Sequence, residues 1–289
     1  MKAKKVPGWL SGLLTLGTFG VLLWMEHRRP LRRTVESKLM RNARNLAVAT
    51  MGAISIRITE QPVIGPLAAL VEQRRWGLLK LRTIPAWVEV PLAVILLDYT
   101  LYWWHVFAHH VPWMWRFHLP HHVDLDLDAS TALRFHFAEL IASVPWRMGQ
   151  VILIGVTPLS FSVWQTFLVL SIMFHHANVQ LPIETERWLN RIIVTPRMHG
   201  IHHSIVRTEA FSNWSGGLTL WDWLHGTLKL NVPQQEVTIG VPAYLKPEDV
   251  TLPKIIKMPF EEQRPSWLLP GNGQPMKQPL PVAPDHLLA

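Results

Sequence analysis

Long apolar runs alternate with basic and histidine-rich segments along this chain. Residues 8–25 carry no charge and are just long enough to cross a bilayer core of about 30 Å as a helix. A second span is predicted over residues 86–108, although Asp98 lies inside it. Residues 140–176 are apolar again, and a turn signal near Pro158 divides them into two short spans folded as a hairpin. The pattern therefore predicts about four transmembrane helices.

The apolar stretch at residues 46–80 is harder to assign, because charged residues and prolines interrupt it. It fits either a broken span or an interfacial hairpin. The interruptions are Arg57, Glu60, Pro62 and Pro66. Four crossings would put residues 26–44, residues 109–138 and everything after 177 on one face of the membrane. The arginines within 26–44 then mark that face as cytoplasmic.

The composition agrees with a membrane protein. Of the 289 residues, 49% are hydrophobic and 17% are charged, whereas soluble domains carry about 25% charged residues. The 15 tryptophans outnumber the 3 tyrosines, and tryptophan favours membrane–water interfaces. The net charge of +8 gathers beside the apolar segments without a nucleic-acid-binding motif, so we expect anionic lipid rather than nucleic acid as the partner. The absence of cysteine excludes disulfides, thiolate zinc sites, iron–sulfur clusters and cysteine nucleophiles.

Histidines carry the candidate chemistry. Twelve of the 15 histidines lie between residues 105 and 203. Residues at i, i+3 and i+4 share a face of a helix, so the spacings HxxxH and HxxHH each aim several imidazoles in one direction. Imidazole is a ligand of iron, zinc and copper. The groups are His105/His109/His110, His118/His121/His122 with His136 nearby, His175/His176, and His199/His202/His203. Their place at the boundary of one predicted face indicates a metal site.

The number of histidines indicates two metal ions. Eight or more imidazoles exceed what one ion accepts, which is roughly four to six ligands. The motifs contain neither a Glu-x-x-His pair nor a His-Glu-x-x-His sequence, so the site is rich in nitrogen and poor in carboxylates. His110, His136 and His175 adjoin stronger candidates, and a supporting or structural role is open for each of them.

Three further side chains are candidates for catalytic roles, namely Asp98, Tyr102 and Asn178. Asp98, Tyr102 and His105 line one face of a helix, and an ionisable residue inside a span indicates function. We expect Asp98 to orient the ring of His105, and the alternative is a buried hydrogen bond to a neighbouring helix. The three aspartates within residues 124–128, in contrast, are expected to cap a helix and to form a solvated turn.

Four segments of the chain together resemble the fatty acid hydroxylase superfamily, which includes sterol desaturases. They are YWWHVFAHHVPWMWRFHLPHHVDLDLDASTALRFH, FHHANV, TPRMHGIHHS and LTLWDWLHGT. The resemblance runs from about Asp98 to Thr227. Val106, Phe137 and His225 stand where the family commonly has arginine, proline and phenylalanine, and none of these departures removes a metal ligand. The predicted metal ligands are His105, His109, His118, His121, His122, His136, His176, His199, His202 and His203.

The resemblance implies two iron ions that are held by histidines and that activate O2 to attack an unactivated C–H bond of a lipid. The lipid would be a sterol, a fatty acyl chain or a related molecule, and the outcome would be hydroxylation or desaturation. Zinc is a possible substitute for iron in a purified sample. The chain has no dinucleotide fingerprint and no haem-binding domain, so we expect an external electron donor, a ferredoxin or a cytochrome with its NAD(P)H reductase.

A metal-binding or metal-transport membrane protein is the alternative. A transporter would place its ligands near the bilayer midplane with acidic residues along a path, whereas these histidines gather at the predicted helix ends. The spacing therefore favours the enzyme.

The spans and the resemblance together predict an all-α fold, an integral membrane helical bundle with a cytoplasmic, histidine-rich helical cap. Within this single membrane domain we expect N-terminal anchor helices at 1–85, a catalytic region at 86–232 and a C-terminal cytoplasmic tail at 233–289. The short N-terminus and the lack of an ER-retrieval signal favour a bacterial inner membrane over an ER membrane.

Overall fold

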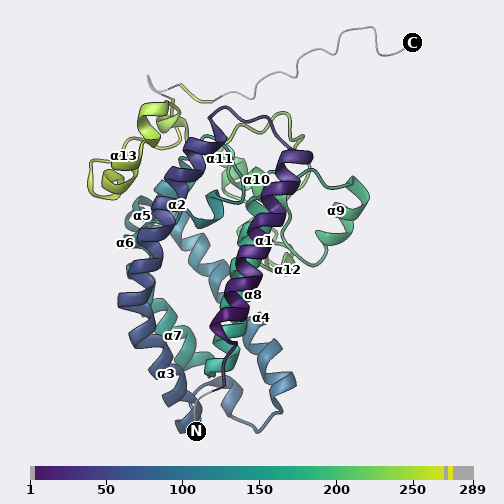
Figure 1. The fold of residues 1–289 in the computed structure, drawn as a ribbon, viewed down its shortest axis with the longest axis vertical. Helices are drawn as coiled ribbons and strands as arrows, with labels where there is room; N and C mark the ends of the chain where they lie inside the picture. Colours follow the sequence, from purple (N-terminus) through teal and green to yellow (C-terminus); the bar gives the residue numbers. More distant parts are fainter. Residues whose placement is uncertain (1–3, 270–272, 276–289) are drawn as a thin grey trace.

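The computed structural model of the protein describes residues 4–269 and 273–275 (Figure 1). Within these residues the secondary structure is helical, and β-structure is limited to isolated bridges. The longer helices are α1 (Gly8–Arg28), α2 (Lys38–Ser55), α3 (Gln61–Arg74), α4 (Ala86–His110), α5 (Pro112–His122), α7 (Val144–Ile154) and α8 (Pro158–His176). The short ones are α6 (Phe137–Ala142), α9 (Ile183–Leu189), α10 (Pro196–His202), α11 (Arg207–Ala210), α12 (Leu220–Leu224) and α13 (Leu252–Lys257).

The described chain also contains short helical turns that are wound more tightly or more widely than an α-helix. Five are 3-10 turns, namely η2 (Leu78–Lys80), η3 (Thr131–Leu133), η4 (Pro242–Tyr244), η5 (Pro247–Val250) and η6 (Met258–Phe260). The remaining one, η1 (Ile56–Glu60), is a π-helical turn between α2 and α3. The predicted all-α fold is confirmed for the described residues.

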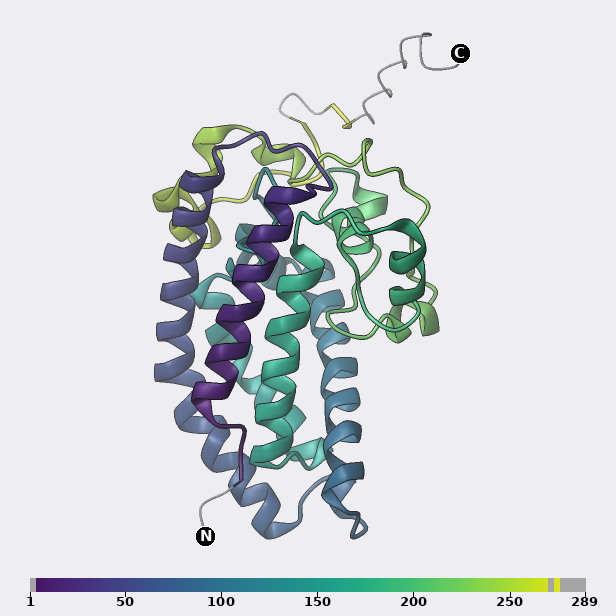
Figure 2. The ribbon, with the colours of Figure 1, turned by 45° about the vertical axis from the view of Figure 1, so that its right-hand side comes forward.

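Four helical stretches are long and apolar enough to cross a membrane, as the sequence predicts. They are α1, α4, residues Phe137–Ile154 that contain α6 and α7, and α8. The hairpin at 140–176 turns where it was expected, because α7 ends at Gly155 in the left-handed conformation and Pro158 begins α8. Helix α8 packs against both α4 and α1 (Figure 2). The buried side chains of Leu97, Val151 and Trp164 join α4, α7 and α8 in one core.

The uncertain stretch at 46–80 forms part of a long helical rod rather than a hairpin. Helices α2, η1 and α3 follow one another without a break from Lys38 to Arg74 and run beside the bundle from one end to the other (Figure 1). At the π-turn the N–H of Gln61 donates to the carbonyl of Ile56, five residues earlier. The reversal comes only after Arg74. The rod therefore differs from the interfacial hairpin, and it is not one of the four stretches that are apolar enough to cross a membrane.

A cap covers one end of the bundle, where α1, α4 and α8 finish (Figures 1 and 2). Contacts between distant segments tie the cap together. The N–H of Arg32 donates to the side chain of Asn178 at 2.8 Å, and the N–H of Val35 donates to Asp126 at 2.9 Å. Residues 26–44, 109–138 and the chain after 177 therefore share one face, as predicted.

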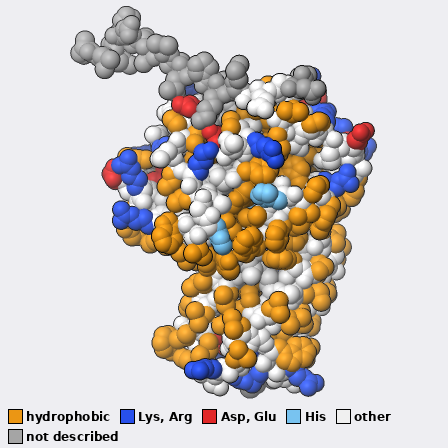
Figure 3. Space-filling model, turned by 180° about the vertical axis from the view of Figure 1, so that it is seen from behind, with side chains coloured by type: hydrophobic (Ala, Val, Ile, Leu, Met, Phe, Trp, Pro, Cys, Tyr) orange, Lys and Arg blue, Asp and Glu red, His pale blue; other side chains and the backbone are white. Residues whose placement is uncertain are grey.

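The surface divides into a belt and a charged cap. Figure 3 shows hydrophobic side chains covering the narrower lower part of the molecule, with Lys and Arg at its lower end and charged side chains of both signs over the cap. Such a belt with charged ends is the surface that a membrane-spanning bundle presents to lipid and water. The protein is accordingly an integral membrane protein with its histidines at one end of the bundle.

Residues 233–269 of the predicted C-terminal tail form short helices and turns that pack against the cap. Val241 and Tyr244 lie in one apolar cluster with Leu119 and Val123, which border the second histidine motif. Helix α13 and the turns η5 and η6 surround this cluster. The rest of the predicted tail, apart from residues 273–275, lies outside the described residues.

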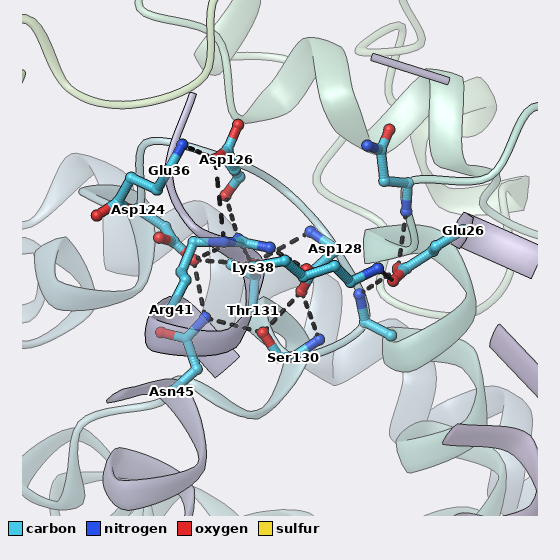
Figure 4. A network of polar contacts seen from close by, with 12 residues as sticks. Glu26, Glu36, Lys38, Arg41, Asn45, Asp124, Asp126, Asp128, Ser130 and Thr131 are labelled. Atoms are coloured by element: carbon cyan, nitrogen blue, oxygen red, sulfur yellow. Dashed lines mark hydrogen bonds and ion pairs between the residues drawn. The ribbon is translucent and has the colours of Figure 1, made fainter. Parts of the chain in front are cut away.

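The aspartates of residues 124–128 contradict the predicted solvated turn. Asp124, Asp126 and Asp128 are all buried, and each lies against the guanidinium of the buried Arg41 on α2 (Figure 4). Arg134 pairs with Asp124 from the other side at 3.2 Å. Burial alone would raise the pKa of Asp124, but the neighbouring arginine charges lower it to about 2, so the carboxylate stays ionised. The prediction was wrong because the partner cations lie far away in the sequence.

This charge network also supports the second histidine motif. The Nε of Arg134 donates to the carbonyl of Pro120 at 2.8 Å, immediately before His121 and His122. Asn45 on α2 donates to Asp124 at 3.0 Å. The network therefore joins the α2–α3 rod to the end of α5, from which two of the candidate ligands project.

Candidate metal centre

The structure gathers eight of the predicted ligands into two groups. Group 1 contains His105 and His109 from α4, His122 from α5 and His202 from α10. Group 2 contains His121 from α5, His176 from α8, His199 from α10 and His203, which directly follows α10. Within each group, one ring nitrogen from every histidine lies within 4.8 Å of the other three. Seven of the eight side chains are buried, and that of His105 is half-buried.

The ring nitrogens converge at distances that suit a shared cation. In group 2 the Nε2 atom of His176 lies 3.1 Å from that of His121 and 3.1 Å from that of His199. In group 1 the Nε2 atoms of His109 and His122 are also 3.1 Å apart. Four nitrogens at about 2.0–2.1 Å from a tetrahedral metal would stand about 3.3 Å from one another. Both groups thus have the dimensions of a metal site.

Backbone carbonyls fix the orientation of three rings. The Nδ1 atoms of His105, His176 and His202 donate to the carbonyls of Trp214 (2.7 Å), Ile172 (2.7 Å) and Ser212 (2.9 Å). A carbonyl only accepts, so Nδ1 carries the proton in these rings and the lone pair of Nε2 points into the group. The Nε2 of His202 is buried without a hydrogen-bond partner. An unpartnered, inward-facing nitrogen of this kind fits a metal ligand.

Electrostatics keeps these rings neutral. Burial, followed by the proximity of the other histidines, lowers the pKa of His121, His122, His199 and His203 well below the usual range. The same burial lowers the pKa of His202 to about 3. Neutral imidazole is the form that coordinates a metal, so the ligand nitrogens are available at physiological pH.

His118 lies between the two groups. Its Nε2 is 3.2 Å from that of His122, and its ring centroid is 5.2 Å from that of His121. Its Nδ1 pairs with the carboxylate of Glu139 on α6 at 2.9 Å, which leaves the Nε2 lone pair facing the groups. His118 is therefore placed as a ninth candidate ligand, although it belongs to neither group of four.

The remaining histidines of this region differ in their surroundings. Both nitrogens of His136 are engaged by the backbone, because Nδ1 accepts from the N–H of Ala138 and Nε2 donates to the carbonyl of Ile256. His136 thus caps α6 and is not brought into either group. His110 is exposed and bonds to its own helix. His175 is buried with its ring centroid 4.0 Å from that of His199, beside group 2.

The three candidate catalytic side chains lie around the site rather than in the groups. Asp98 accepts from the N–H of Leu218 at 2.9 Å and from the indole of Trp221 at 2.7 Å, while the Nδ1 of His105 bonds to a carbonyl instead. This matches the alternative of a buried hydrogen bond to a neighbouring segment.

Tyr102 and Asn178 also have structural partners. The hydroxyl of Tyr102 lies 3.1 Å from that of Thr227, and its ring stacks on His225. The side-chain amide of Asn178 bonds both the N–H and the carbonyl of Arg32 at 2.8 and 2.9 Å. Asn178 thereby anchors the segment between α1 and α2 to the end of α8.

Sequence reasoning missed the segment 212–214, whose carbonyls orient His105 and His202. Asn213 holds this segment in place with a left-handed backbone (φ 57°), and its side chain donates to the carbonyls of Met198 and Lys229, each at 2.8 Å. A backbone carbonyl carries no residue-type signal, so no motif could have revealed it. Glu139 was missed for another reason, because a lone glutamate has no characteristic spacing to His118.

An elongated cavity of about 400 Å³ opens between the helices beside the histidines. Its histidine end is lined by His105, His118 and His121 as well as by rings from group 2. Apolar side chains such as Leu101 and Leu168 line its walls. Residues of the predicted N-terminal anchor, Ala49 and Gly52 among them, form one wall, so this region takes part in shaping the site. A volume of this size suits a lipid-sized ligand.

The fold and the site define a helical membrane protein with two convergent histidine groups beside an apolar cavity. Residues 90–227, just under half of the chain, match the family model described as fatty acid hydroxylase, so the chain is similar to that family. The resemblance drawn from the histidine motifs is confirmed. No solved structure matches the chain.

Curated relatives share part of their length with the chain. It is 32% identical to ornithine lipid hydroxylase OlsE from Rhizobium tropici over 54% of this chain and 46% of that protein. It is 31% identical to the human alkylglycerol monooxygenase over 47% of this chain and 30% of that protein. The human cholesterol 25-hydroxylase is 27% identical over 49% of this chain and 51% of that protein. The chain thus spans about a third to a half of the length of these relatives.

Proposed function

We propose that this protein is an O2-dependent di-iron enzyme that hydroxylates a C–H bond of a membrane lipid. The observation that carries the proposal is the position of two four-histidine groups at the end of an apolar cavity within the membrane bundle. The relatives named as hydroxylases or monooxygenases support hydroxylation. Desaturation is the alternative outcome, and it is distinguished by the product.

Each histidine group would hold one iron ion, with His118 adjacent to both. Iron bound there would supply the activation of O2. The chain itself contributes the neutral imidazoles, the carbonyls of Ser212 and Trp214 that orient them, and the Glu139 carboxylate on His118. The donor set is nitrogen-rich, which suits iron and also zinc, so zinc is a possible substitute in a purified sample.

The cavity wall contributes the rest of the chemistry. Apolar side chains beside the histidines hold an alkyl segment close to the ligand nitrogens and exclude water from the reacting carbon. Hydroxylation inserts one oxygen atom of O2 into the C–H bond and reduces the other to water with two electrons and two protons. We assign these electrons to an external donor, a ferredoxin or a cytochrome with its NAD(P)H reductase.

We also propose that the cap faces the cytoplasm. The arginines between α1 and α2 lie on that side, and short basic loops favour the cytoplasmic face. A soluble electron donor would then reach the histidine end of the bundle directly. A bacterial inner membrane remains our proposal for the location, with the ER membrane as its eukaryotic counterpart.

Metal analysis and turnover test the proposal. The purified full-length chain should contain about two iron ions, and it should consume O2 and NAD(P)H with a reductase extract while a lipid gains one oxygen atom. Mass spectrometry of lipids from a deletion strain and its parent would identify the product. Stoichiometric zinc with no O2 consumption under any donor would instead support the alternative of a non-catalytic metal-binding or metal-transport protein.

A further inference from the structure

A second polar cluster lies deep in the bundle, away from the histidines. Glu60 of η1, Arg147 of α7 and Gln165 of α8 all line the same cavity as the histidines. Gln165 donates to Glu60 at 3.1 Å, and the Nε of Arg147 lies 4.0 Å from the other carboxylate oxygen of Glu60. Charged side chains inside a membrane bundle are costly and are by default functional. The proposed oxidation chemistry does not use them.

The helix geometry places this cluster far from the metal groups. Gln165 and His176 lie on α8 and are separated by eleven residues. At 1.5 Å per residue, the polar cluster stands about 16 Å further along the cavity than the ligand of group 2. The cavity therefore has histidines at one end, apolar walls between, and an acid–base pair towards the other end.

The deep cluster contains more hydrogen-bond donors than the protein satisfies. The Nε of Arg147 and the indole N–H groups of Trp146 and Trp164 are buried, and the described residues give them no hydrogen-bond partner. Both tryptophans line the cavity. The guanidinium of Arg147 lies over the ring of Trp164, 4.5 Å from its centroid. Buried donors without a partner are unfavourable, so an oxygen atom supplied from the cavity would stabilise this end.

The local backbone is also unusual at this point. Glu60 is the last residue of the π-turn that interrupts the α2–α3 rod. A π-turn re-aims the side chains that follow it, and such turns occur frequently at functional sites. Here the turn coincides with the one carboxylate of the rod that lines the cavity.

The charges select the chemistry of the ligand. A carboxylate at this position would lie against Glu60, and an ammonium group would lie against Arg147, so either ion meets a like charge. A hydroxyl group avoids both problems, because it donates to the Glu60 carboxylate and accepts from a buried N–H. A plain hydrocarbon end would leave the buried N–H groups of Trp146, Arg147 and Trp164 without a hydrogen-bond partner.

On this basis we propose that Glu60, Arg147 and Gln165 bind the hydroxyl group of a lipid substrate whose oxidised carbon lies at the opposite end of the molecule, about 16 Å away. The substrate class is a neutral lipid with a hydroxyl group remote from the reacting C–H bond, such as a sterol or a long-chain alcohol. This inference rests on the proposed function for the oxidation, whereas the hydroxyl site itself does not require it.

Binding measurements on the full-length protein in lipid nanodiscs test the site without turnover. The paired probes are cholesterol against 5α-cholestane and octadecan-1-ol against octadecane, which differ by one hydroxyl group. We expect each alcohol to bind roughly ten-fold or more tightly than its hydrocarbon, because the site would otherwise bury unpaired polar groups. The two pairs also distinguish a sterol from a linear alcohol.

A charge-neutral double variant assigns the preference to the cluster. Glu60→Met with Arg147→Met removes both charges together, so no uncompensated buried charge remains. The matched control is Arg57→Met with Glu72→Met, which removes the same charges from exposed positions on the α2–α3 rod. The preference for alcohols should persist in the control and fall to about one-fold in the Glu60/Arg147 variant.

The outcomes separate this inference from the proposed function. Equal binding of alcohol and hydrocarbon by the wild-type protein would overturn it, and so would a preference that survives in the Glu60/Arg147 variant. If that variant does not fold, the comparison of alcohol and hydrocarbon binding by the wild-type protein still tests the inference. Oxidation of lipids without a remote hydroxyl at the same rate would leave the proposed function intact and contradict the inference. A preference for alcohols without turnover by any donor would support the inference and contradict the proposed function.

Discussion

The cap holds two clusters of buried polar side chains, and they are built in opposite ways. In the first, Arg41 and Arg134 lie among the carboxylates of residues 124–128, so positive and negative groups pair within the protein (Figure 4). In the second, groups 1 and 2 bring together imidazoles whose ring nitrogens converge without any opposite charge beside them. The two clusters meet at the end of α5.

The difference shows which cluster serves the fold and which serves a ligand. Opposite buried charges compensate one another, and removal of one partner leaves a buried charge without compensation. The histidine groups contain no opposite charge, and a bound cation would complete their converging nitrogens. Substitutions in the first cluster should therefore affect stability, and substitutions in the second should affect metal content and activity.

The largest effect is expected for His121→Ala, which removes one histidine of group 2. Activity should fall below detection and the iron content should fall by about half, while membrane insertion and the thermal unfolding midpoint change little. Iron analysis, turnover and thermal unfolding on the same preparation check this. The exposed His27→Ala is the control and should retain both iron and activity. Full iron content in His121→Ala would mean that group 2 does not bind metal.

The complementary change is Arg41→Met in the charge network. Removal of this guanidinium leaves Asp128 without a buried cation and leaves Asp124 with Arg134 as its remaining buried partner, which should reduce the free energy of unfolding by about 3–5 kcal/mol. Unfolding in mixed detergent micelles measures the change. The exposed pair Arg187–Glu184 offers the control, and Arg187→Met should stay within about 0.5 kcal/mol. If Arg41→Met kept its normal stability but lost iron, the charge network would serve the metal site rather than the fold, which contradicts this prediction.

A smaller effect is expected at Glu139, whose carboxylate pairs with His118. Glu139→Leu removes the carboxylate that orients His118 and should lower metal affinity or activity by about 10–100-fold. Glu139→Gln keeps an acceptor oxygen for the Nδ1 proton and should recover much of the loss. Competition with a chelator measures the affinity of each variant. Equal losses in both variants would show that negative charge, rather than orientation, is the contribution of this residue.

The smallest effect concerns pH in chelator-treated protein. Burial and the neighbouring histidines hold the pKa of His122 and His203 below the unfolded value of about 6.5. The unfolded chain therefore binds more protons below pH 6.5, so stability is present above that pH and is lost as the pH falls.

Each such histidine should cost up to about 1.4 kcal/mol per pH unit below 6.5. Thermal unfolding at pH 7.5, 6.5 and 5.5 measures this loss. The Asp124 carboxylate has its pKa near 2 and does not titrate in this window, so Asp124 should not contribute to the loss. A midpoint that is constant between pH 7.5 and 5.5 would contradict neutral, buried rings.

The sequence by itself determined the four apolar spans, the hairpin at Pro158 and the histidine motifs. These features are local, because hydrophobic runs and i, i+3, i+4 spacings depend on residues within a few turns of one helix. The same locality explains why eight of the predicted ligands fall in the two groups. His136 was predicted as a ligand from its nearness to the second motif, but it lies outside both groups. Its two nitrogens bond to the backbone of Ala138 and Ile256 instead.

Tertiary structure alone decided how the motifs are divided. His121 and His122 are adjacent in sequence but belong to different groups, because successive residues on a helix project about 100° apart. The same packing brought Arg41 to Asp124 across 83 residues and Gln165 to Glu60 across 105. No local pattern encodes such pairs, since each depends on which helix faces happen to meet. The sequence therefore specified the chemistry of this protein, and the packing of its helices decided where each group acts.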